Sequence, residues 1–239
     1  MTKILFLKWN EMKIKELEFS QVSFDDIKSN QTIDSFIRAS NDYLGAIGYT
    51  EHGFRHVSLV ASVAKNILTT LGYPKRLQEL AEIAGYLHDI GNVVNRQDHG
   101  QSASLIAFDI LKQLGATPDE IALVASAIGN HEEEIGEPVN PVAASLILAD
   151  KSDVHKTRVR NPSMIAADIH DRVNYAVDRS FLSVNKTDKL ISLHLNVDTK
   201  ISQVIEYFEI FMSRMNMCRR AAKFLDCNFE LIINERKLL

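Results

Sequence analysis

The sequence predicts a mainly α-helical fold, with a helical bundle followed by a small antiparallel β element and a long C-terminal helix. Apolar residues recur with a period near 3.6 through residues 31–178, and glycine, proline and capping residues divide that region into helix-sized segments. The period then changes to 2 near Phe181. We therefore expect an N-terminal extension over 1–30, a helical core over 31–178 and a C-terminal unit over 179–239.

The apolar stripes and their flanking residues predict a series of helices before residue 151. Thr32 is the expected N-cap of the first helix, and Pro74 opens the third. The clearest start signal is Thr117-Pro118-Asp119-Glu120, because Thr117 can cap a helix while Glu120 completes a capping box. The expected helices cover 33–44, 51–71, 74–87, 102–114, 118–131 and 142–150.

The C-terminal third combines helices with strands. Asn161-Pro162 predicts a helix that continues to about Val177. Residues 181–184 and 191–197 flank a polar turn and read as a β-hairpin. A long helix is expected over 201–225, and a last strand over 229–233 can join the hairpin in a small antiparallel sheet.

Composition limits the classes of function. The chain has 239 residues, a net charge of −4 and a pI near 6.1, so it carries no global basic field that would attract nucleic acid. Its two cysteines form no CxxC motif, which favours a reducing compartment. No apolar run reaches the ~18 residues of a membrane span. We expect a cytoplasmic protein without a membrane partner; whether it forms a homodimer stays open.

Histidine and aspartate residues recur at the expected helix ends. His88 and Asp89 are adjacent, and adjacent side chains serve one centre only where a helix ends. His56 lies on the preceding helix, whose apolar face should pack against the helix that carries His88. Imidazole nitrogens and carboxylate oxygens are good ligands for first-row metals. The candidates in chain order are His56, His88, Asp89, His99, His131 and Asp150.

This ordered set resembles the HD-domain superfamily of metal-dependent phosphohydrolases, over about residues 50–155. It is similar to the two-metal branch, which includes the HD-GYP phosphodiesterases and the diiron HD oxygenases. The resemblance implies one ion held by four residues and a second held by three, with Asp89 shared. The first group is His56, His88, Asp89 and Asp150, and the second is Asp89, His99 and His131. Such donors suit iron, manganese, zinc, cobalt or nickel better than calcium.

The resemblance implies a hydrolase that acts on a nucleotide or another small phosphate ester with two divalent transition-metal ions. A metal pair can activate water near neutral pH and clamp phosphate oxygens. Two alternatives stay open. One is a diiron oxygenase, which uses a similar ligand set, and the other is a metal-stabilised regulatory module without catalysis.

Several residues receive specific expected roles. Asp89, His88 and Lys151 are the expected catalytic residues, and Asp153 could orient a ligand histidine. A basic segment after Asp150 could bind substrate phosphates, or could be a solvated turn. Its expected substrate-binding residues are Lys151, His155, Lys156 and Arg158, with Arg160 beyond them. His52 lies four residues before His56 on the same helical face, and it is a candidate extra ligand.

The sequence also departs from the HD-GYP pattern. That family carries HisHisGlu followed by a Gly-Tyr-Pro signature, whereas this chain has Asn130-His131-Glu132 and only Gly136-Glu137-Pro138. Asparagine is a poorer ligand than histidine, which favours two metal ions over three. We therefore do not transfer cyclic di-GMP hydrolysis to this chain.

Overall fold

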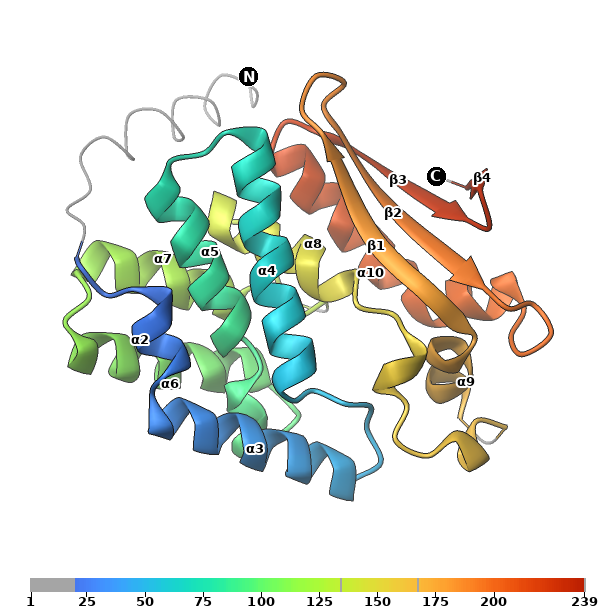
Figure 1. The fold of residues 1–239 in the computed structure, drawn as a ribbon, viewed down its shortest axis with the longest axis horizontal. Coiled ribbons are helices and arrows are strands. Elements are labelled where there is room, and N and C mark those ends of the chain that lie inside the picture. Colours follow the sequence, from blue (N-terminus) through green and yellow to red (C-terminus); the bar gives the residue numbers. More distant parts are fainter. Residues whose placement is uncertain (1–19, 134, 167, 239) are drawn as a thin grey trace.

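The computed structural model describes residues 20–133, 135–166 and 168–238, and it confirms a mainly α-helical fold (Figure 1). Its α-helices are α2 (Phe24–Lys28), α3 (Gln31–Ala46), α4 (Phe54–Leu71), α5 (Lys75–Leu87), α6 (His99–Leu114), α7 (Pro118–Gly129), α8 (Pro141–Lys151), α9 (Ile169–Tyr175) and α10 (Val204–Phe224). Short 3₁₀ helices are η2 (Ile90–Val93), η3 (Lys156–Arg158) and η4 (Pro162–Met164). The strands are β1 (Val177–Asn185), β2 (Leu190–Val197), β3 (Asn228–Ile233) and β4 (Arg236–Lys237).

Capping residues explain where the helices begin. The capping box of Thr117 and Glu120 at the start of α7 is present as predicted. The first long helix, however, begins one residue before Thr32, because the Asn30 side chain caps it by accepting from the amide of Thr32 at 2.9 Å. α6 begins at His99 rather than at Ser102.

The helix predicted from Pro162 to Val177 is wrong, because the chain forms two shorter pieces there. The Asp168 side chain accepts from the amides of His170 and Asp171, at 2.6 and 3.2 Å. It thereby caps a new helix, α9, separate from η4.

The sheet has the order β1-β2-β3-β4. β1 and β2 form the predicted antiparallel hairpin, but β3 pairs with β2 in parallel, and β4 returns antiparallel to β3. The expectation of a wholly antiparallel sheet is therefore wrong. α10 connects β2 to β3, and a crossover helix brings the next strand back in the same direction (Figure 1).

Helix α8 lies at the centre of the core. Its residues 141–149 are buried, and it contacts α4, α5, α7 and α10. α10 also packs against β2 and β3, so the apolar side chains of the bundle and of the C-terminal segment form one continuous cluster. This packing places the C-terminal helix, α10, beside α8, whose last turn contains Asp150.

The end of the expected N-terminal extension joins the same core. Residues 1–19 lie outside the described residues, but Val22 and Ile27 are buried in the cluster. Ser20 Oγ donates to Glu120 Oε2 at 2.5 Å, and Arg76 Nε donates to the other oxygen at 2.6 Å. These contacts attach residue 20 to the first turns of α5 and α7. In the described part of the chain, no helix has both the length and the apolar character that a bilayer crossing requires.

Candidate metal centre

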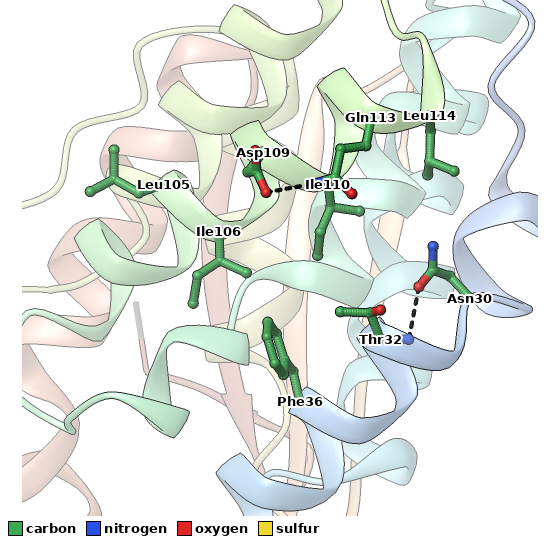
Figure 2. Close-up of a pocket in the computed structure, with 9 residues that line it drawn as sticks. All are labelled: Asn30, Thr32, Phe36, Leu105, Ile106, Asp109, Ile110, Gln113 and Leu114. Atoms are coloured by element: carbon green, nitrogen blue, oxygen red, sulfur yellow. Dashed lines mark hydrogen bonds between the residues drawn. The ribbon is translucent and has the colours of Figure 1, made fainter.

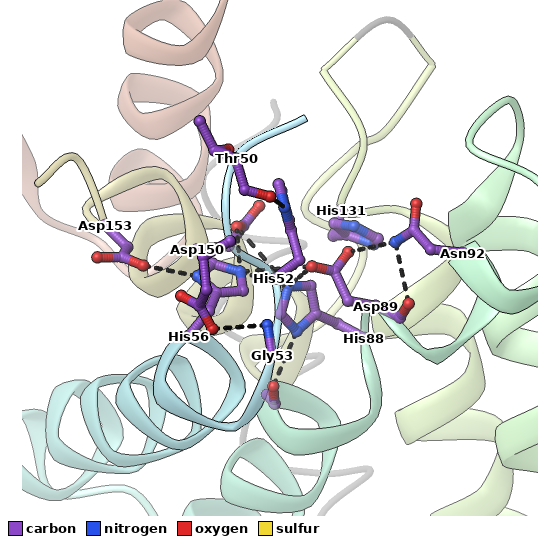
Figure 3. A network of polar contacts seen from close by, with 12 residues as sticks. Thr50, His52, Gly53, His56, His88, Asp89, Asn92, His131, Asp150 and Asp153 are labelled. Carbon is purple, nitrogen blue, oxygen red and sulfur yellow. Dashed lines mark hydrogen bonds and ion pairs between the residues drawn. The ribbon is translucent and has the colours of Figure 1, made fainter. Parts of the chain in front are cut away.

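The ends of α4, α5, α6, α7 and α8 meet at one place in the described part of the chain. Figure 3 shows His56, His88, Asp89, His131 and Asp150 close together there. Each candidate ligand lies in the first or last turn of a helix, or just beyond it. His56 lies in the first turn of α4, His88 and Asp89 directly follow α5, His99 begins α6, His131 follows α7, and Asp150 lies in the last turn of α8. The structure therefore brings all six predicted ligands together.

The first group of donors surrounds a common point. His56 Nε2 lies 3.2 Å from His88 Nε2, and Asp150 Oδ1 lies 3.4 and 3.7 Å from these two nitrogens. Asp89 Oδ2 lies 3.4 Å from each of them. Ligand bonds of about 2.0–2.2 Å separate neighbouring donor atoms by roughly 3.0–3.6 Å. The spacing of these four residues is thus close to that of a metal's ligand shell.

The second group faces the other oxygen of Asp89. His99 Nε2 lies 3.3 Å from Asp89 Oδ1 and 3.1 Å from His131 Nε2. Atoms of His88, Asp89 and His131 also lie within 4.8 Å of one another. Asp89 therefore directs one oxygen to each group, as a ligand that bridges two ions would.

Hydrogen bonds at Nδ1 determine the tautomer of the imidazole rings. The Nδ1 atoms of three histidines face backbone carbonyls, which only accept, so these nitrogens carry the protons. The pairs are His88 with Gly85 at 2.8 Å, His99 with Arg96 at 3.1 Å and His131 with Ile128 at 2.6 Å. In a neutral ring the inward-facing Nε2 then has a lone pair for a metal.

Asp153 orients the remaining histidine, as expected. His56 Nδ1 lies 2.7 Å from Asp153 Oδ2, and that carboxylate also accepts from Arg55 at 2.7 Å. Arg158 Nη1 donates to the backbone oxygen of Asp153 at 2.8 Å. A carboxylate behind a histidine fixes its ring and makes Nε2 a better ligand.

Two features show that the residues fit a cation. His99 Nε2 and His131 Nε2 both carry lone pairs and face each other at 3.1 Å, and although Arg96 Nη1 lies 3.3 Å from His99 Nε2, the lone pair of His131 faces only another lone pair, which is unfavourable. Asp89 Oδ2 is buried and has no hydrogen-bond partner. A buried carboxylate oxygen without a partner is costly, and a metal ion at this point would satisfy it.

The electrostatics keep the carboxylates charged and His131 neutral. Burial opposes the ionised forms of Asp89 and Asp150, but neighbouring His88 for the former and Lys151 for the latter hold both pKa values well below the usual range. Burial, with His99 and His88 nearby, keeps the pKa of His131 well below its usual value. These are the protonation states in which such groups bind metals.

The pKa of His56 reflects the excess of negative charge around the first group of donors. Burial and nearby Arg158 act against its charged form, yet the carboxylates of Asp150, Asp153 and Asp89 raise its pKa to about 10. The site therefore favours a bound cation, and a divalent ion would replace the proton on Nε2.

The predicted substrate-binding residues do not all lie at the cluster. Lys151 Nζ contacts Asp150 Oδ2 at 2.5 Å, and Arg158 is buried behind Asp153. Lys156 instead pairs with the Asp178 carboxylate at 2.6 Å, and His155 Nε2 bonds the backbone oxygen of Asp178 at 2.9 Å.

Arg160 also has partners away from the cluster, because its guanidinium donates to Tyr49 and Asn41. His52 bonds Thr50 through Nδ1 at 2.7 Å, and its ring centre lies 5.3 Å from that of His56. The candidate extra ligand is therefore adjacent to the first group (Figure 3).

Other polar residues contact the candidate ligands but were not predicted from the sequence to do so. Asn92 Nδ2 donates to Asp89 Oδ1 at 3.1 Å, and Glu132 Oε1 accepts from the amide of Gly100 at 2.5 Å. Arg96 Nη1 lies 3.3 Å from His99 Nε2. Each lies within three residues of a candidate ligand, and this proximity in sequence was the available signal.

Gly85 lets α4 and α5 approach closely enough to bring His56 and His88 together. A Cβ at this position would lie 2.7 Å from Ala61 Cα and 2.8 Å from Ala61 N, which are backbone atoms of α4. We expect Gly85→Ala to push the helices apart and to cost about 1–3 kcal/mol of unfolding free energy. It should also weaken divalent-metal binding, measured by calorimetric titration.

The matched control is Gly129→Ala in α7, where an added Cβ meets only side-chain atoms at 3.6 Å or more. That variant should keep wild-type stability and metal affinity. Equal behaviour of the two variants would contradict the role given to Gly85.

A surface groove of about 560 Å³ lies elsewhere, between α3 and α6 (Figure 2). Apolar side chains such as Phe36, Ile106 and Ile110 line it. Its only acidic residue, Asp109, is hydrogen-bonded to Gln113. The groove contains none of the six candidate ligands, so the chemistry belongs to the helix-end cluster.

Comparisons with known proteins agree with the location of the candidate metal centre. The family model described as HD domain matches residues 53–155, which include all six candidate ligands. The uncharacterized protein MJ1020 of Methanocaldococcus jannaschii is 29% identical over 180 residues, which are 64% of this chain and 68% of that protein. Ribonuclease Y of Opitutus terrae is 31% identical over 116 residues, which are 48% of this chain but only 20% of Ribonuclease Y.

Proposed function

Since residues 53–155 belong to the HD-domain superfamily, we propose that this chain is a metal-dependent hydrolase of a nucleotide or another small phosphate ester. One observation carries the proposal. Asp89 directs its two oxygens to two separate groups of imidazole nitrogens, and one of these oxygens is buried without a hydrogen-bond partner. The similarity to a protein named as a ribonuclease gives further support for hydrolysis of phosphate esters.

The proposed centre holds two divalent transition-metal ions. His56, His88, Asp89 and Asp150 would hold the first, and Asp89, His99 and His131 the second. All donors are nitrogen or oxygen, which suits iron, manganese, zinc, cobalt or nickel. When bound, the ions would supply an activated water near neutral pH and electrostatic stabilisation of phosphate oxygens.

Residues around the proposed ligands orient them and shield them from bulk water. Asp153 fixes the His56 ring, and Asn92 holds one oxygen of Asp89. The four candidate histidines are buried, which limits access by bulk water.

Cationic side chains would bind the substrate phosphate. We propose Lys151 and Arg158 for this role, because both border the cluster, whereas His155 and Lys156 contact Asp178 of β1 instead. Together with His88 and Asp89, Lys151 forms the proposed catalytic set. His52, beside the first group, stays a proposed extra ligand.

The test begins with metal analysis of protein purified without added metal. Phosphate release from a panel of nucleotides and simple phosphate esters is then measured with Mn²⁺, Fe²⁺, Co²⁺ and Ni²⁺, and oxygen uptake is measured for the ferrous protein. We expect about two ions per chain and turnover that chelation abolishes. Metal-loaded protein that releases no phosphate would overturn the proposed reaction, and oxygen uptake would favour the oxygenase alternative.

A further inference from the structure

A row of alternating charges connects the C-terminal helix to Asp150. Arg214 of α10 places Nε 2.7 Å from Glu133 Oε1, in the loop that follows His131. The same oxygen lies 3.3 Å from Lys151 Nζ, which in turn lies 2.5 Å from Asp150 Oδ2. We call Arg214, Glu133, Lys151 and Asp150 the charge relay.

The two inner members of the charge relay are more buried than the two outer members. The side chains of Arg214 and Glu133 are each 24% exposed, that of Asp150 is 13% exposed and that of Lys151 only 7%. A buried ammonium is strongly held by its carboxylate partners, because few water molecules can replace them. Lys151 has two such partners, so Glu133 helps Asp150 to hold the ammonium in place.

This arrangement determines how Asp150 presents its carboxylate. Oδ2 is bound by Lys151, which leaves Oδ1 to face His56 and His88 at 3.4 and 3.7 Å. If the ammonium moved, the carboxylate could rotate or use Oδ2 for the cluster. The position of Lys151 thus controls the geometry of one candidate ligand.

We propose that Arg214 is a positioning residue of the metal centre, acting through Glu133 and Lys151 on Asp150. The proposal rests on the proposed function, since it takes Asp150 as a metal ligand. It assigns α10 a role beyond packing, because the helix supplies the outermost charge of the relay. Lys151 accordingly orients Asp150 as well as facing the substrate.

The same helix offers a matched control. Arg220 of α10 also contacts this loop, through the Glu137 carboxylate and the backbone oxygen of Gly136 at 3.3 Å. Neither partner touches Lys151 or a candidate ligand in the described contacts. If α10 only held the loop in place, loss of either arginine would have a similar effect on the centre.

The test compares Mn²⁺ affinity of Arg214→Gln and Arg220→Gln by calorimetric titration, with thermal unfolding recorded for both. Glutamine keeps much of the aliphatic stem but removes the guanidinium, whose central carbon lies 4.3 Å from the centre of the Phe211 ring, so thermal unfolding measures the loss of that cation–π contact. We expect Arg214→Gln to weaken binding at one position by about tenfold, the lower end of the range for direct partners of a ligand, because Arg214 acts through two intervening side chains. Arg220→Gln should stay within about twofold of wild type by the same reasoning.

A double-mutant cycle with Glu133→Gln separates the relay from general loosening. The double variant should bind no more weakly than the weaker single variant, because both changes interrupt the same path. Arg214→Lys should recover part of the affinity, and it tests the charge if the glutamine variant does not fold. Wild-type affinity in Arg214→Gln, equal losses in the two arginine variants or additive losses in the cycle would each overturn the proposal.

Because the test measures metal affinity, failure of the charge relay can be distinguished from failure of the proposed hydrolysis. Wild-type protein that binds Mn²⁺ but releases no phosphate would remove the proposed reaction and leave the relay intact. Normal phosphate release together with wild-type affinity in Arg214→Gln would remove the relay and leave the reaction.

Discussion

Replacement of Asp89 by asparagine is expected to remove both metal ions and to lower phosphate release by more than about a thousandfold. A thousandfold loss corresponds to about 4 kcal/mol of transition-state stabilisation, within what metal ions supply. The reason is the position of Asp89 between the two groups of donors, with Oδ2 3.4 Å from His56 and His88 and Oδ1 3.3 Å from His99. Metal content per chain and initial rates of phosphate release measure the effect.

Asparagine keeps the shape of the side chain, so the fold should be retained. Its amide oxygen can still accept the hydrogen bond from Asn92, but its NH₂ group would face the two imidazoles in place of a carboxylate oxygen. Asp150→Asn is the matched control, because Asp150 Oδ1 faces only the first group. It should reduce binding at one position only. An Asp89→Asn protein that still holds one ion tightly would contradict the bridging role.

The sequence was informative about the ligands because each lies next to a helix boundary. Thr117, Pro118 and Glu120 begin α7, and its apolar stripe predicted a helix that ends at His131, whereas α7 ends at Gly129 and His131 follows it by two residues. The apolar stripes of α4 and α5 likewise predicted that His56 and His88 lie on packed neighbours. The ligand positions therefore followed from local rules of helix start, length and period.

The residues that support the ligands were harder to predict, because their contacts are not local. Arg214 and Glu133 meet only because α10 crosses α8, a packing that no helical period reveals. Similar reasoning applies to β3, whose direction depends on how α10 returns the chain to the sheet. The interruption between η4 and α9 depends on a single cap, Asp168, inside a region whose apolar pattern reads as continuous.

The electrostatic role of the basic segment also could not be inferred from charge alone. Lys156 and Arg158 are two residues apart, yet Lys156 is half exposed and paired with Asp178, while Arg158 is buried behind Asp153. The difference arises because η3 directs Lys156 toward Asp178 of β1 and Arg158 toward Asp153. A run of charges in sequence therefore does not define a single binding surface.

Replacement of His131 by alanine is expected to reduce the metal content from about two ions per chain to about one and nearly to abolish hydrolysis. His131 Nε2 lies 3.1 Å from His99 Nε2, and its other nitrogen donates to the carbonyl of Ile128 at 2.6 Å, so its lone pair faces the second position. The fold should survive, because a continuous apolar cluster carries most of the stability and the lost hydrogen bond contributes only about 1 kcal/mol.

Asn130→Ala is the control for that experiment. Among the described residues, the Asn130 side chain hydrogen-bonds to Ser126 O and to the amide of Glu137, and to no candidate ligand. The control should keep both ions, whereas His131→Ala should leave the first group intact and the second with two donors, His99 and Asp89. A divalent ion with only two protein ligands, and water at its other coordination positions, is bound weakly, since structural and catalytic sites use three or four protein ligands. If His131→Ala keeps two ions and full turnover, the dinuclear proposal is wrong and hydrolysis must depend on the group formed by His56, His88, Asp89 and Asp150 alone.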